Sequence, residues 1–329
     1  MMRQMNTADT GALPDGLVCP GCQGDLSQQD GQIVCRTCGL TYRIDDGIPV
    51  FVRGNYDDHD ELDHVAAHPG HGRRSPAGLH KADQTAYFDH EALADFEIER
   101  PAGLPELYRF LLTEKFRRSV KPFKGQLDGW SALTVCGGSG MDAEFLAAAG
   151  ASVISSDLSL GAARRVRERA RRHGVSITSI AADVEHLPFA DQSVDLVYVH
   201  DGLHHLEDPW AGLTEMTRVA RRAVCISEPA RALATSIAIR LGLALEREEA
   251  GNRVERLRPE AVTAALRAAG FNVVQADRYA MYYHHVPGKL TAFLSRRPLL
   301  PVAIMGWQLA NGVIGRFGNK LSIAAVREP

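Results

Sequence analysis

Glycines and carboxylates with a regular spacing are the residues of this sequence whose types can bind a charged cofactor. An apolar run that predicts a buried strand leads directly into three glycines, Gly137, Gly138 and Gly140. Because glycine has no Cβ, the backbone at these positions can adopt positive φ and approach a ligand closely. A helix-favouring segment, 143–149, follows, and the positive end of its dipole suits a carboxylate or a phosphate.

Acids end the next two apolar runs. Asp157 comes shortly after Val153-Ile154, and Asp183 comes directly after Ile180-Ala181-Ala182. A strand, a glycine turn, a helix and a second strand that ends in an acid form the arrangement that holds a nucleoside at the carboxyl edge of a parallel sheet. In this arrangement Asp157 can accept hydrogen bonds from both ribose hydroxyls. An ordinary strand-to-helix turn would explain the glycines alone, but it does not explain Asp157.

Asp183, the acid at the third strand end, is followed by a short Leu187-Pro188-Phe189 turn and a fourth apolar strand over 194–199. With these ordered motifs, residues 130–230 resemble the class I S-adenosylmethionine-dependent methyltransferases, in the branch that contains quinone and natural-product methyltransferases. The resemblance implies an α/β fold, a Rossmann-like seven-stranded sheet with helices on both faces. It also implies S-adenosylmethionine as the cofactor.

The same resemblance assigns the cofactor contacts. Gly138 and Gly140 would lie against the methionine part, Asp157 would hold the ribose, and Asp183 would accept a hydrogen bond from the adenine amino group. The complete set that it implies is Cys136, Gly137, Gly138, Gly140, Asp157, Leu158, Asp183, Val184 and His200. His200 and Asp201 would together close the far side of the site.

Two positions depart from the family pattern. Thr134 stands where the family usually has an acid, and Cys136 stands where it has a first glycine. The missing acid weakens the expected grip on the methionine ammonium, whereas cysteine is small enough to keep the turn. We therefore expect an unusual but functional site; a methyltransferase fold that has lost cofactor binding is the alternative.

Two Cys-x-x-Cys pairs, separated by twelve residues, are formed by Cys19, Cys22, Cys35 and Cys38. Four thiolates with this spacing suit a tetrahedral zinc ion, which would then have no open position for catalysis. Two disulfides are the alternative and require an oxidising compartment. The segment 1–7 lacks the apolar core of a signal peptide, so zinc and a cytoplasmic location are expected.

Residues 40–51 complete a zinc ribbon with a strand, a turn and an apolar exit. The ribbon resembles small modules that precede or partner methyltransferases, including some that act on ribosomal RNA. The whole chain of 329 residues then divides into a zinc ribbon with a disordered N-terminus, a flexible linker rich in His, Gly and Pro, and a methyltransferase domain. The respective ranges are 1–53, 54–104 and 105–329, with insertions in the last domain at 229–258 and 279–318.

Composition limits the choice of partners. The hydrophobic share of 45% and the charged share of 23% are typical of a globular protein, and a net charge of −3 gives no overall attraction to nucleic acid. No run approaches the roughly 20 apolar residues that a membrane span needs.

The linker histidines could form a second metal site, but scattered histidines among Gly and Pro more often belong to a flexible loop. The pattern from Pro105 to Val120 predicts a helix that packs beside the cofactor site, and the resemblance implies that it caps the substrate entrance.

One predicted helix, 160–173, carries six arginines: Arg164, Arg165, Arg167, Arg169, Arg171 and Arg172. They could form a phosphate-binding face for RNA or for an acidic membrane. The preferred interpretation is a solvated outer helix whose Ala162, Ala163, Val166 and Ala170 face the sheet. Helices beyond the second strand of such sheets usually lie away from the substrate.

Candidate catalytic residues follow the fourth strand, where an acceptor would lie. His204 and His205 are the favoured pair, because an oxygen or carbon acceptor must lose a proton and histidine can take it near neutral pH. A His-His pair is common at this position in the resembling family across diverse acceptors, so loop structure explains it equally well. Glu228, Tyr282 and Tyr283 are weaker candidates for the pocket wall.

Taken together, the sequence predicts a methyltransferase that acts by in-line displacement on a small or lipid-linked acceptor, such as a natural product, a sugar or a quinone-like ring. RNA base methylation is the alternative, supported by the ribbon and the arginine helix; a non-enzymatic interaction protein is another. The apolar insertion 279–318 fits a hydrophobic acceptor or peripheral membrane contact. A lid whose apolar residues pack within the protein, or a dimer interface, explains the same residues.

Overall fold

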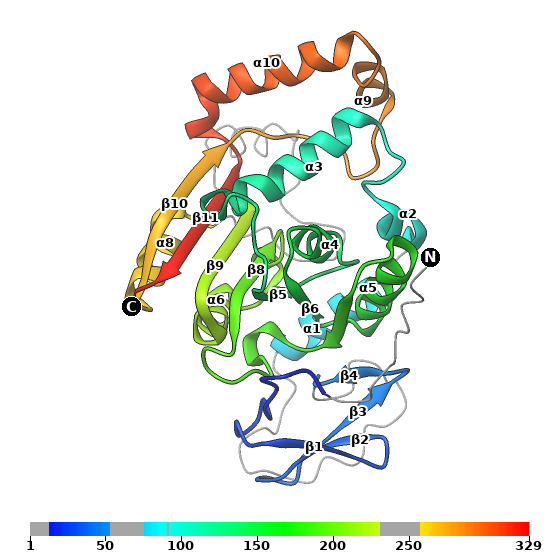
Figure 1. Cartoon of the computed structure of the whole chain (residues 1–329), viewed down its shortest axis with the longest axis vertical. Helices are drawn as coiled ribbons and strands as arrows, with labels where there is room; N and C mark the ends of the chain where they lie inside the picture. The colour runs from blue at the N-terminus through cyan, green and yellow to red at the C-terminus, as the bar shows by residue number, and fades with distance from the viewer. Residues whose placement is uncertain (1–12, 53–75, 91, 231–256, 329) are drawn as a thin grey trace, which may run out of the picture.

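The computed structural model of the chain describes residues 13–52, 76–90, 92–230 and 257–328 (Figure 1). Its strands are Leu26–Gln29 (β1), Gln32–Cys35 (β2), Thr41–Asp45 (β3), Ile48–Val50 (β4), Ser131–Val135 (β5), Ser152–Asp157 (β6), Ile177–Ala181 (β7), Val194–His200 (β8), Ala220–Pro229 (β9), Phe271–Tyr279 (β10) and Lys320–Arg327 (β11). Its α-helices are Pro76–Asp89 (α1), Ala94–Glu99 (α2), Glu106–Ser119 (α3), Met141–Ala148 (α4), Leu160–His173 (α5), Pro209–Val219 (α6), Pro259–Ala268 (α8), Lys289–Leu294 (α9) and Leu299–Ile314 (α10).

Seven of these strands form the central sheet, in the order β7-β6-β5-β8-β9-β11-β10. The first five run parallel, and β11 inserts antiparallel between β9 and β10. Strand β8 is buried along nearly its whole length, as its continuous apolar sequence requires of a central parallel strand. The predicted α/β, Rossmann-like seven-stranded sheet is therefore confirmed.

Helices cover both faces of this sheet. Because strand side chains alternate, Leu133 and Val135 of β5 face one side and Ala132 faces the other. The first side packs against helices α6 and α8, and the second packs against α3 and α4. The carboxyl ends of β5, β6, β7 and β8 consequently meet at one edge, where the loops of the site begin.

The zinc ribbon continues the central sheet. Strand β4 pairs in parallel with β7 through Val50 and Ala181, and the Phe51 amide donates to the Ala181 carbonyl at 2.7 Å. The eleven strands therefore form one sheet, with β1 to β4 at one end (Figure 1). Cys19 and Tyr42 of the ribbon also share a hydrophobic core with Phe189. The sequence predicted the ribbon but not its union with the central sheet.

Part of the predicted flexible linker is helical. Helices α1 and α2 lie within 54–104, and α1 packs on α5, as does α2. Gln84 and Thr85 of α1 and Ile98 of α2 are buried. The apolar residues of these helices form only short runs, which charged residues interrupt. For this reason the sequence pattern indicates a loop. Residues 54–75 lie outside the described part of the chain.

Helix α5 confirms the preferred interpretation of the arginine-rich segment in part: its alanines and valine face the core, but Arg165 and Arg169 are not solvated. Ala162, Ala163, Val166 and Ala170 are buried, and Arg164 forms an ion pair with Asp45 of the ribbon at 2.6 Å. Other arginines of the helix pair with carboxylates too: Arg167 with Asp46, Arg171 with Glu168, and Arg172 with Glu168, Asp95 and Glu99. Arg165 and Arg169 are buried. The helix thus presents no array of unpaired arginines to solvent.

The predicted insertion 279–318 lies between β10 and β11 and forms α9 and α10, which pack on α3. Among the described residues, no helix combines the length and the apolar character that crossing a bilayer requires. Of the other predicted insertion, 229–258, residues 231–256 lie outside the described part of the chain.

Candidate active site and metal centre

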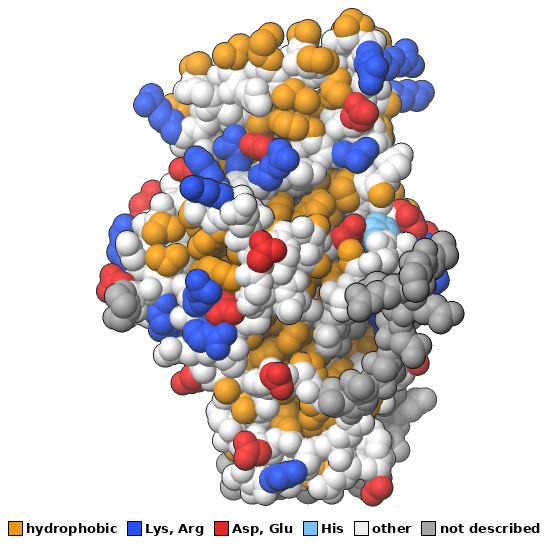
Figure 2. Space-filling model, in the orientation of Figure 1, with side chains coloured by type: hydrophobic (Ala, Val, Ile, Leu, Met, Phe, Trp, Pro, Cys, Tyr) orange, Lys and Arg blue, Asp and Glu red, His pale blue; other side chains and the backbone are white. Residues whose placement is uncertain are grey.

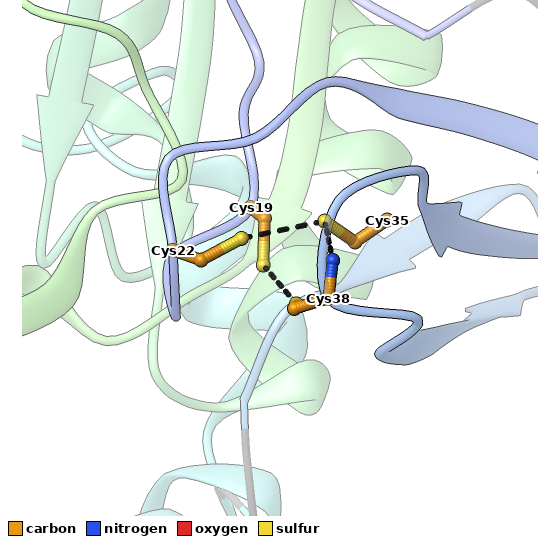
Figure 3. Close-up of side chains that lie close together, drawn as sticks. All are labelled: Cys19, Cys22, Cys35 and Cys38. Carbon is orange, nitrogen blue, oxygen red and sulfur yellow. Dashed lines mark hydrogen bonds between the residues drawn. The ribbon is translucent and has the colours of Figure 1, made fainter.

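The four ribbon cysteines lie together in the structure (Figure 3). Their sulfur atoms all lie within 4.8 Å of one another; the Cys19 and Cys38 sulfurs are 3.7 Å apart, and those of Cys22 and Cys35 are 3.5 Å apart. These separations fit the edges of a tetrahedron around a zinc ion whose bonds to sulfur are about 2.3 Å long. None of these four cysteines forms a disulfide, as the zinc interpretation predicts.

A cavity of about 530 Å³ opens at the carboxyl ends of strands β5 to β8. It is lined by most of the residues that the sequence assigned to the site: Cys136, Gly137, Gly138, Asp157, Leu158, Asp183, Val184, His200, His204 and His205. Gly140 starts α4 behind this lining and packs against Val166. Residues that are far apart in the chain are therefore brought to one cavity.

The glycine turn has the backbone conformation that the sequence pattern requires. Gly138 and Gly140 have positive φ of 53° and 80°, and Cys136 has a φ of 51° although it carries a side chain. A Cβ atom at Gly137 would lie 2.2 Å from the Ser155 hydroxyl. The turn therefore needs glycine at 137 for space and at 138 and 140 for conformation.

Asp157 anchors this turn. Its two carboxylate oxygens accept hydrogen bonds from the backbone amides of Gly138 and Ser159, each at 2.9 Å. Burial raises the pKa of Asp157 above its ordinary value, partly offset by these amides. The carboxylate keeps further lone pairs for a ligand's hydroxyl groups, because each oxygen can accept more than one hydrogen bond.

A lysine from the predicted linker contacts Asp183. The Lys81 ammonium lies 2.6 Å from Asp183 and 2.7 Å from Glu185. Although burial opposes ionisation, the hydrogen bond with His186 and the charge of Lys81 lower the pKa of Asp183 to about 2. Helix α1 is thereby attached to the third strand end, where the resemblance places the adenine.

Arg165 is a buried cation with an unsatisfied group. Its side chain lines the cavity, the residue is 8% exposed, and among the described residues its Nε atom has no hydrogen-bond partner. A buried donor without a partner is costly, so a ligand that accepts hydrogen bonds would be favoured here. The position of Arg165 in α5 gave no sign of this role, because it is one of six arginines in that helix and most of the others pair with carboxylates at the surface.

A carboxylate contacts the glycine turn from α2. Glu97 is 7% exposed, accepts a hydrogen bond from Ser139 at 3.2 Å and pairs with Arg100 at 2.9 Å. Thr134, which replaces the family's acid, donates instead to Ser155 at 2.8 Å. The cavity thus has an acid beside the turn, but the acid comes from a different element than in the family pattern.

The far wall of the cavity is a network of charged groups around His200. The His200 ring contacts Asp142 through Nδ1 at 2.7 Å and Asp201 through Nε2 at 3.4 Å. Burial would lower the pKa of His200, but the charges of Asp142 and Asp201 and the hydrogen bond with Asp142 together raise it. Conversely, burial would raise the pKa of Asp142, but the charge and hydrogen bond of His200, together with Lys115 and Tyr198, lower it. Tyr198 completes this contact by donating to Asp142 at 3.1 Å.

Two lysines hold Asp201 in the same network. Lys115 of α3 is fully buried and lies 2.6 Å from the Asp201 carboxylate, and Lys320 of β11 lies 3.1 Å from it. Against the effect of burial, these cations hold the pKa of Asp201 well below its usual range. Tyr283 is 3.1 Å from Lys115, and its pKa is raised to about 12, mainly by burial. This wall of the cavity therefore has polar groups with fixed positions.

The two histidines proposed as catalytic differ in their surroundings. His204 is 3% exposed, and its Nδ1 lies 2.7 Å from Glu228. Glu228 is fully buried and accepts hydrogen bonds from the amides of Gly202 and Leu203, so it holds the loop rather than lining the cavity. His205 is half-buried, packs edge-on against Phe88 and lines the cavity.

The sequence analysis missed several residues of the site, namely Lys81, Glu97, Arg100, Arg165 and Lys320, which line the cavity, and Lys115, which holds Asp201. Lys115 lies in a helix that was expected beside the entrance, and Lys320 begins the expected last strand. The sequence patterns of those two elements could have indicated that these lysines lie at the site. Lys81 and Glu97 had no such indication, since the sequence of their segment predicts a linker.

Family comparisons match two segments of the chain. Residues 133–226 match the family model described as a methyltransferase domain, and residues 15–47 match the model described as Trm112p-like protein. Curated relatives include demethylmenaquinone methyltransferases. That of Renibacterium salmoninarum is 37% identical over 109 residues, which are 33% of this chain and 44% of the relative. That of Mycobacterium sp. strain JLS is 34% identical over 134 residues, 40% of this chain and 56% of the relative. The chain spans about half the length of these relatives.

Solved structures confirm the fold. The magnesium protoporphyrin IX methyltransferase of Synechocystis PCC 6803 with bound SAH superposes with a TM-score of 0.53 at 18% identity, over 74% of this chain and 98% of that chain. The [4+2]-cyclase SpnF superposes with a TM-score of 0.50 at 17% identity, over 75% of this chain and 95% of that chain. Likeness at this level concerns the fold alone. By its matched segments and its fold, the chain contains a methyltransferase domain joined to a Trm112p-like module.

Proposed function

We propose that this protein transfers a methyl group from S-adenosylmethionine to a small acceptor with a quinone-like ring. One observation carries the proposal: a single cavity joins the glycine turn with the carboxylates Asp157 and Asp183 at the ends of adjacent parallel strands. The demethylmenaquinone methyltransferase relatives, which are 34–37% identical over the matched region, support the class of acceptor.

The residues of the cavity fit the cofactor. Asp157 would accept from the ribose hydroxyls, Asp183 and Val184 would hold the adenine, and Glu97 would attract the methionine ammonium in place of the missing acid at Thr134. The unsatisfied Nε of Arg165 provides a donor for a cofactor oxygen. When bound, the sulfonium cofactor supplies an electrophilic methyl group, and the protein's part is to align the acceptor with it.

The acceptor side combines apolar and polar surfaces. Met281, Phe88 and Tyr283 line the cavity, as an aromatic ring requires, and the network around Asp201 offers donors to ring oxygens. His205 is our candidate for removing the acceptor's proton, because His204 is held by Glu228. The raised pKa of His200 suits it better to holding a proton than to taking one.

The alternative of RNA base methylation loses its main support from the arginine helix. Arg164, Arg167 and Arg171 form ion pairs within the protein, and Arg165 and Arg169 are buried. A phosphate backbone is bound by cations whose charge is not already compensated. We therefore favour the small acceptor.

Cofactor binding is tested by isothermal titration with S-adenosylmethionine and S-adenosylhomocysteine. The variants D157N and D183N keep the side-chain shape but remove the charge, and each is expected to weaken binding about tenfold or more. D25N, at an exposed aspartate of the ribbon, is the matched control and should bind like the wild type. Unchanged affinity in both site variants would exclude the proposed cofactor position.

The acceptor is tested with methyl-labelled cofactor and two substrates, demethylmenaquinone and total RNA. We expect label in the quinone and none in RNA. H205A should lose most of the turnover while cofactor affinity remains, which separates a role in chemistry from a role in cofactor binding. Label in RNA alone would replace the proposed function with the alternative.

A further inference from the structure

Helix α10 has apolar side chains on the face that points to solvent as well as on the face that packs. On the inner face, Ile304 and Trp307 join a cluster with Phe110 of α3 and Tyr279 of β10. The outer face presents Val302, Met305, Leu309 and Val313, which are between 54% and 75% exposed. A surface helix of a globular protein normally has charged or polar residues on that face.

The apolar face continues beyond the helix. We define the α9–α10 surface by the exposed residues Leu290, Phe293, Val302, Met305, Leu309, Val313, Ile314 and Phe317. In Figure 2 hydrophobic side chains gather along the top of the molecule, where Figure 1 places α9 and α10. Contiguous exposed apolar surface of this kind marks a binding site for a protein or a membrane.

The charged residues of the segment that forms this surface have one sign. The segment 279–318 contains no Asp and no Glu, although the chain as a whole has a net charge of −3. Its cations Lys289, Arg296, Arg297 and Arg316 are all exposed. They lie before and after α10, so an apolar stripe has basic residues at both ends. Two of them also lie over aromatic rings of the surface, Arg296 over Phe293 and Arg316 over Phe317.

We propose that the α9–α10 surface binds to an anionic lipid bilayer, with α10 lying in the plane of the interface. Apolar side chains would enter the boundary between headgroups and acyl chains, while the arginines and Lys289 would meet the anionic headgroups. The 16 residues of α10 extend about 24 Å, which is less than the thickness of the hydrocarbon core and suits a helix that lies on the membrane.

A second copy of the chain is a less suitable occupant. A two-fold symmetric contact through this surface would bring four cations of one copy next to four of the other, with no carboxylate from 279–318 between them. An anionic membrane instead compensates every one of these charges. The charge pattern therefore favours lipid over self-association.

The surface is connected to the cavity through the start of the same insertion. Tyr282, Tyr283 and His285 follow β10, line the cavity and precede α9. Membrane contact would therefore bring the cavity close to molecules dissolved in the bilayer. This access to substrates in the bilayer rests on the proposed acceptor, whereas the membrane contact itself rests only on the α9–α10 surface.

The test is co-sedimentation of the purified full chain with vesicles of phosphatidylcholine, with and without phosphatidylglycerol, at low and at high salt. We expect the protein to sediment with the anionic vesicles at low salt and to be released in part by high salt. Its residual binding at high salt should depend on the apolar residues. Absence of sedimentation with anionic vesicles at low salt would overturn the proposal.

Two pairs of variants separate the apolar and the charged contributions. L309E/V313E should reduce the partition coefficient for anionic vesicles by about tenfold or more, whereas V274E, an equal change at an exposed position of β10, should not. R296E/R297E should abolish the preference for phosphatidylglycerol, and R36E in the ribbon should keep it. Circular dichroism establishes that each variant is folded.

Light scattering distinguishes the competing occupant. If the wild type is a dimer that L309E/V313E converts to a monomer, and vesicles do not compete with that dimer, the surface is an interface between copies and the proposal is wrong. Equal vesicle binding by L309E/V313E and the wild type would also contradict the proposed membrane contact. Methyl transfer to a water-soluble quinone is expected to survive in L309E/V313E, so failure of the membrane contact and failure of the proposed function can be told apart.

Discussion

His200 lies between two carboxylates, and its contribution to the stability of the fold depends on pH in the opposite direction to theirs. The raised pKa of His200 means that its contribution to stability is complete below its unfolded value of about 6.5 and is lost as the pH rises through the folded value. The lowered pKa values of Asp142 and Asp201 mean that their contribution is present above about pH 4 and is lost as the pH falls. The network should stabilise the fold most between these limits.

This argument predicts the effect of H200Q. The wild-type midpoint of thermal unfolding should decline as the pH rises above about 6.5, and H200Q should show a smaller decline because the titrating group is gone. Differential scanning calorimetry across a pH series measures this. H90Q, at an exposed histidine, is the control and should decline like the wild type. Parallel curves for H200Q and the wild type would show that the network does not contribute in this way.

The contact between Lys81 and Asp183 gives a second prediction for a single residue. Replacing Lys81 with Met leaves two largely buried carboxylates without their cation, so we expect a loss of about 2–3 kcal/mol in the free energy of unfolding. The pKa of Asp183, about 2 in the wild type, should rise. Urea unfolding and carboxyl NMR titration measure the two effects. K121M, at an exposed lysine, should change neither.

Spacing in the chain revealed some of these residues but not others. The glycine turn and Asp157 stand 17 to 20 residues apart around one helix, and a local pattern is enough to place them in one crevice. Lys81 and Asp183 are 102 positions apart and meet only because α1 packs on α5. No local periodicity encodes such a pair, so it could not be predicted from the sequence.

Among the elements, helices α2 and α5 and the glycine turn are joined by Arg169. This fully buried guanidinium donates to the Ser139 carbonyl and to the Glu144 carboxylate, each at 2.7 Å. It also donates to the carbonyls of Glu97 and Arg100, at 2.5 Å and 2.7 Å. Arginine suits this position because its planar group offers five donors in a fixed geometry.

We therefore predict that R169M destabilises the protein by about 3–5 kcal/mol, because two buried and two partly buried acceptors lose this donor. The variant should also weaken cofactor binding, since the same side chain fixes the glycine turn. R171M, at the exposed end of the same helix, should cost less than about 0.5 kcal/mol. Denaturant unfolding and cofactor titration check both effects. A loss for R169M as small as for R171M would contradict this role of Arg169.

The elements were predicted with unequal success for a physical reason. The parallel strands and α5 have strong apolar patterns, and the structure confirms them. Helices α1 and α2 derive their stability from contacts with α5 rather than from their own amphipathic pattern, since α2 is only six residues long. Such short helices are defined by tertiary packing, and the sequence of that segment instead indicated a linker.

At the scale of the whole molecule, the ribbon and the methyltransferase domain share one sheet and one hydrophobic core. The sequence predicted two modules, because the spacing of the cysteines and the motifs of the sheet are each local. It could not predict the pairing of β4 with β7, which depends on a match between two strands that lie over 120 residues apart. The structure therefore makes zinc a component of the entire fold.

This union predicts a single cooperative response to zinc. We expect one zinc ion per chain by metal analysis, and chelation should lower the midpoint of unfolding of the whole protein by about 10 °C or more. C22S, at an exposed ligand, should have the same effect, and zinc added after chelation should restore the wild-type midpoint. Two separate transitions, with only the smaller one sensitive to chelation, would show that the modules unfold independently.

The position of β4 also bears on how the protein behaves when zinc is scarce. In the absence of the ribbon, β7 would be the edge strand of the large sheet, with a row of unpaired amides and carbonyls open to any other extended chain. A metal centre outside the cavity would thus protect the molecule against aggregation through that edge. Zinc starvation would then be expected to remove the protein from solution before it changes anything in the chemistry of its site.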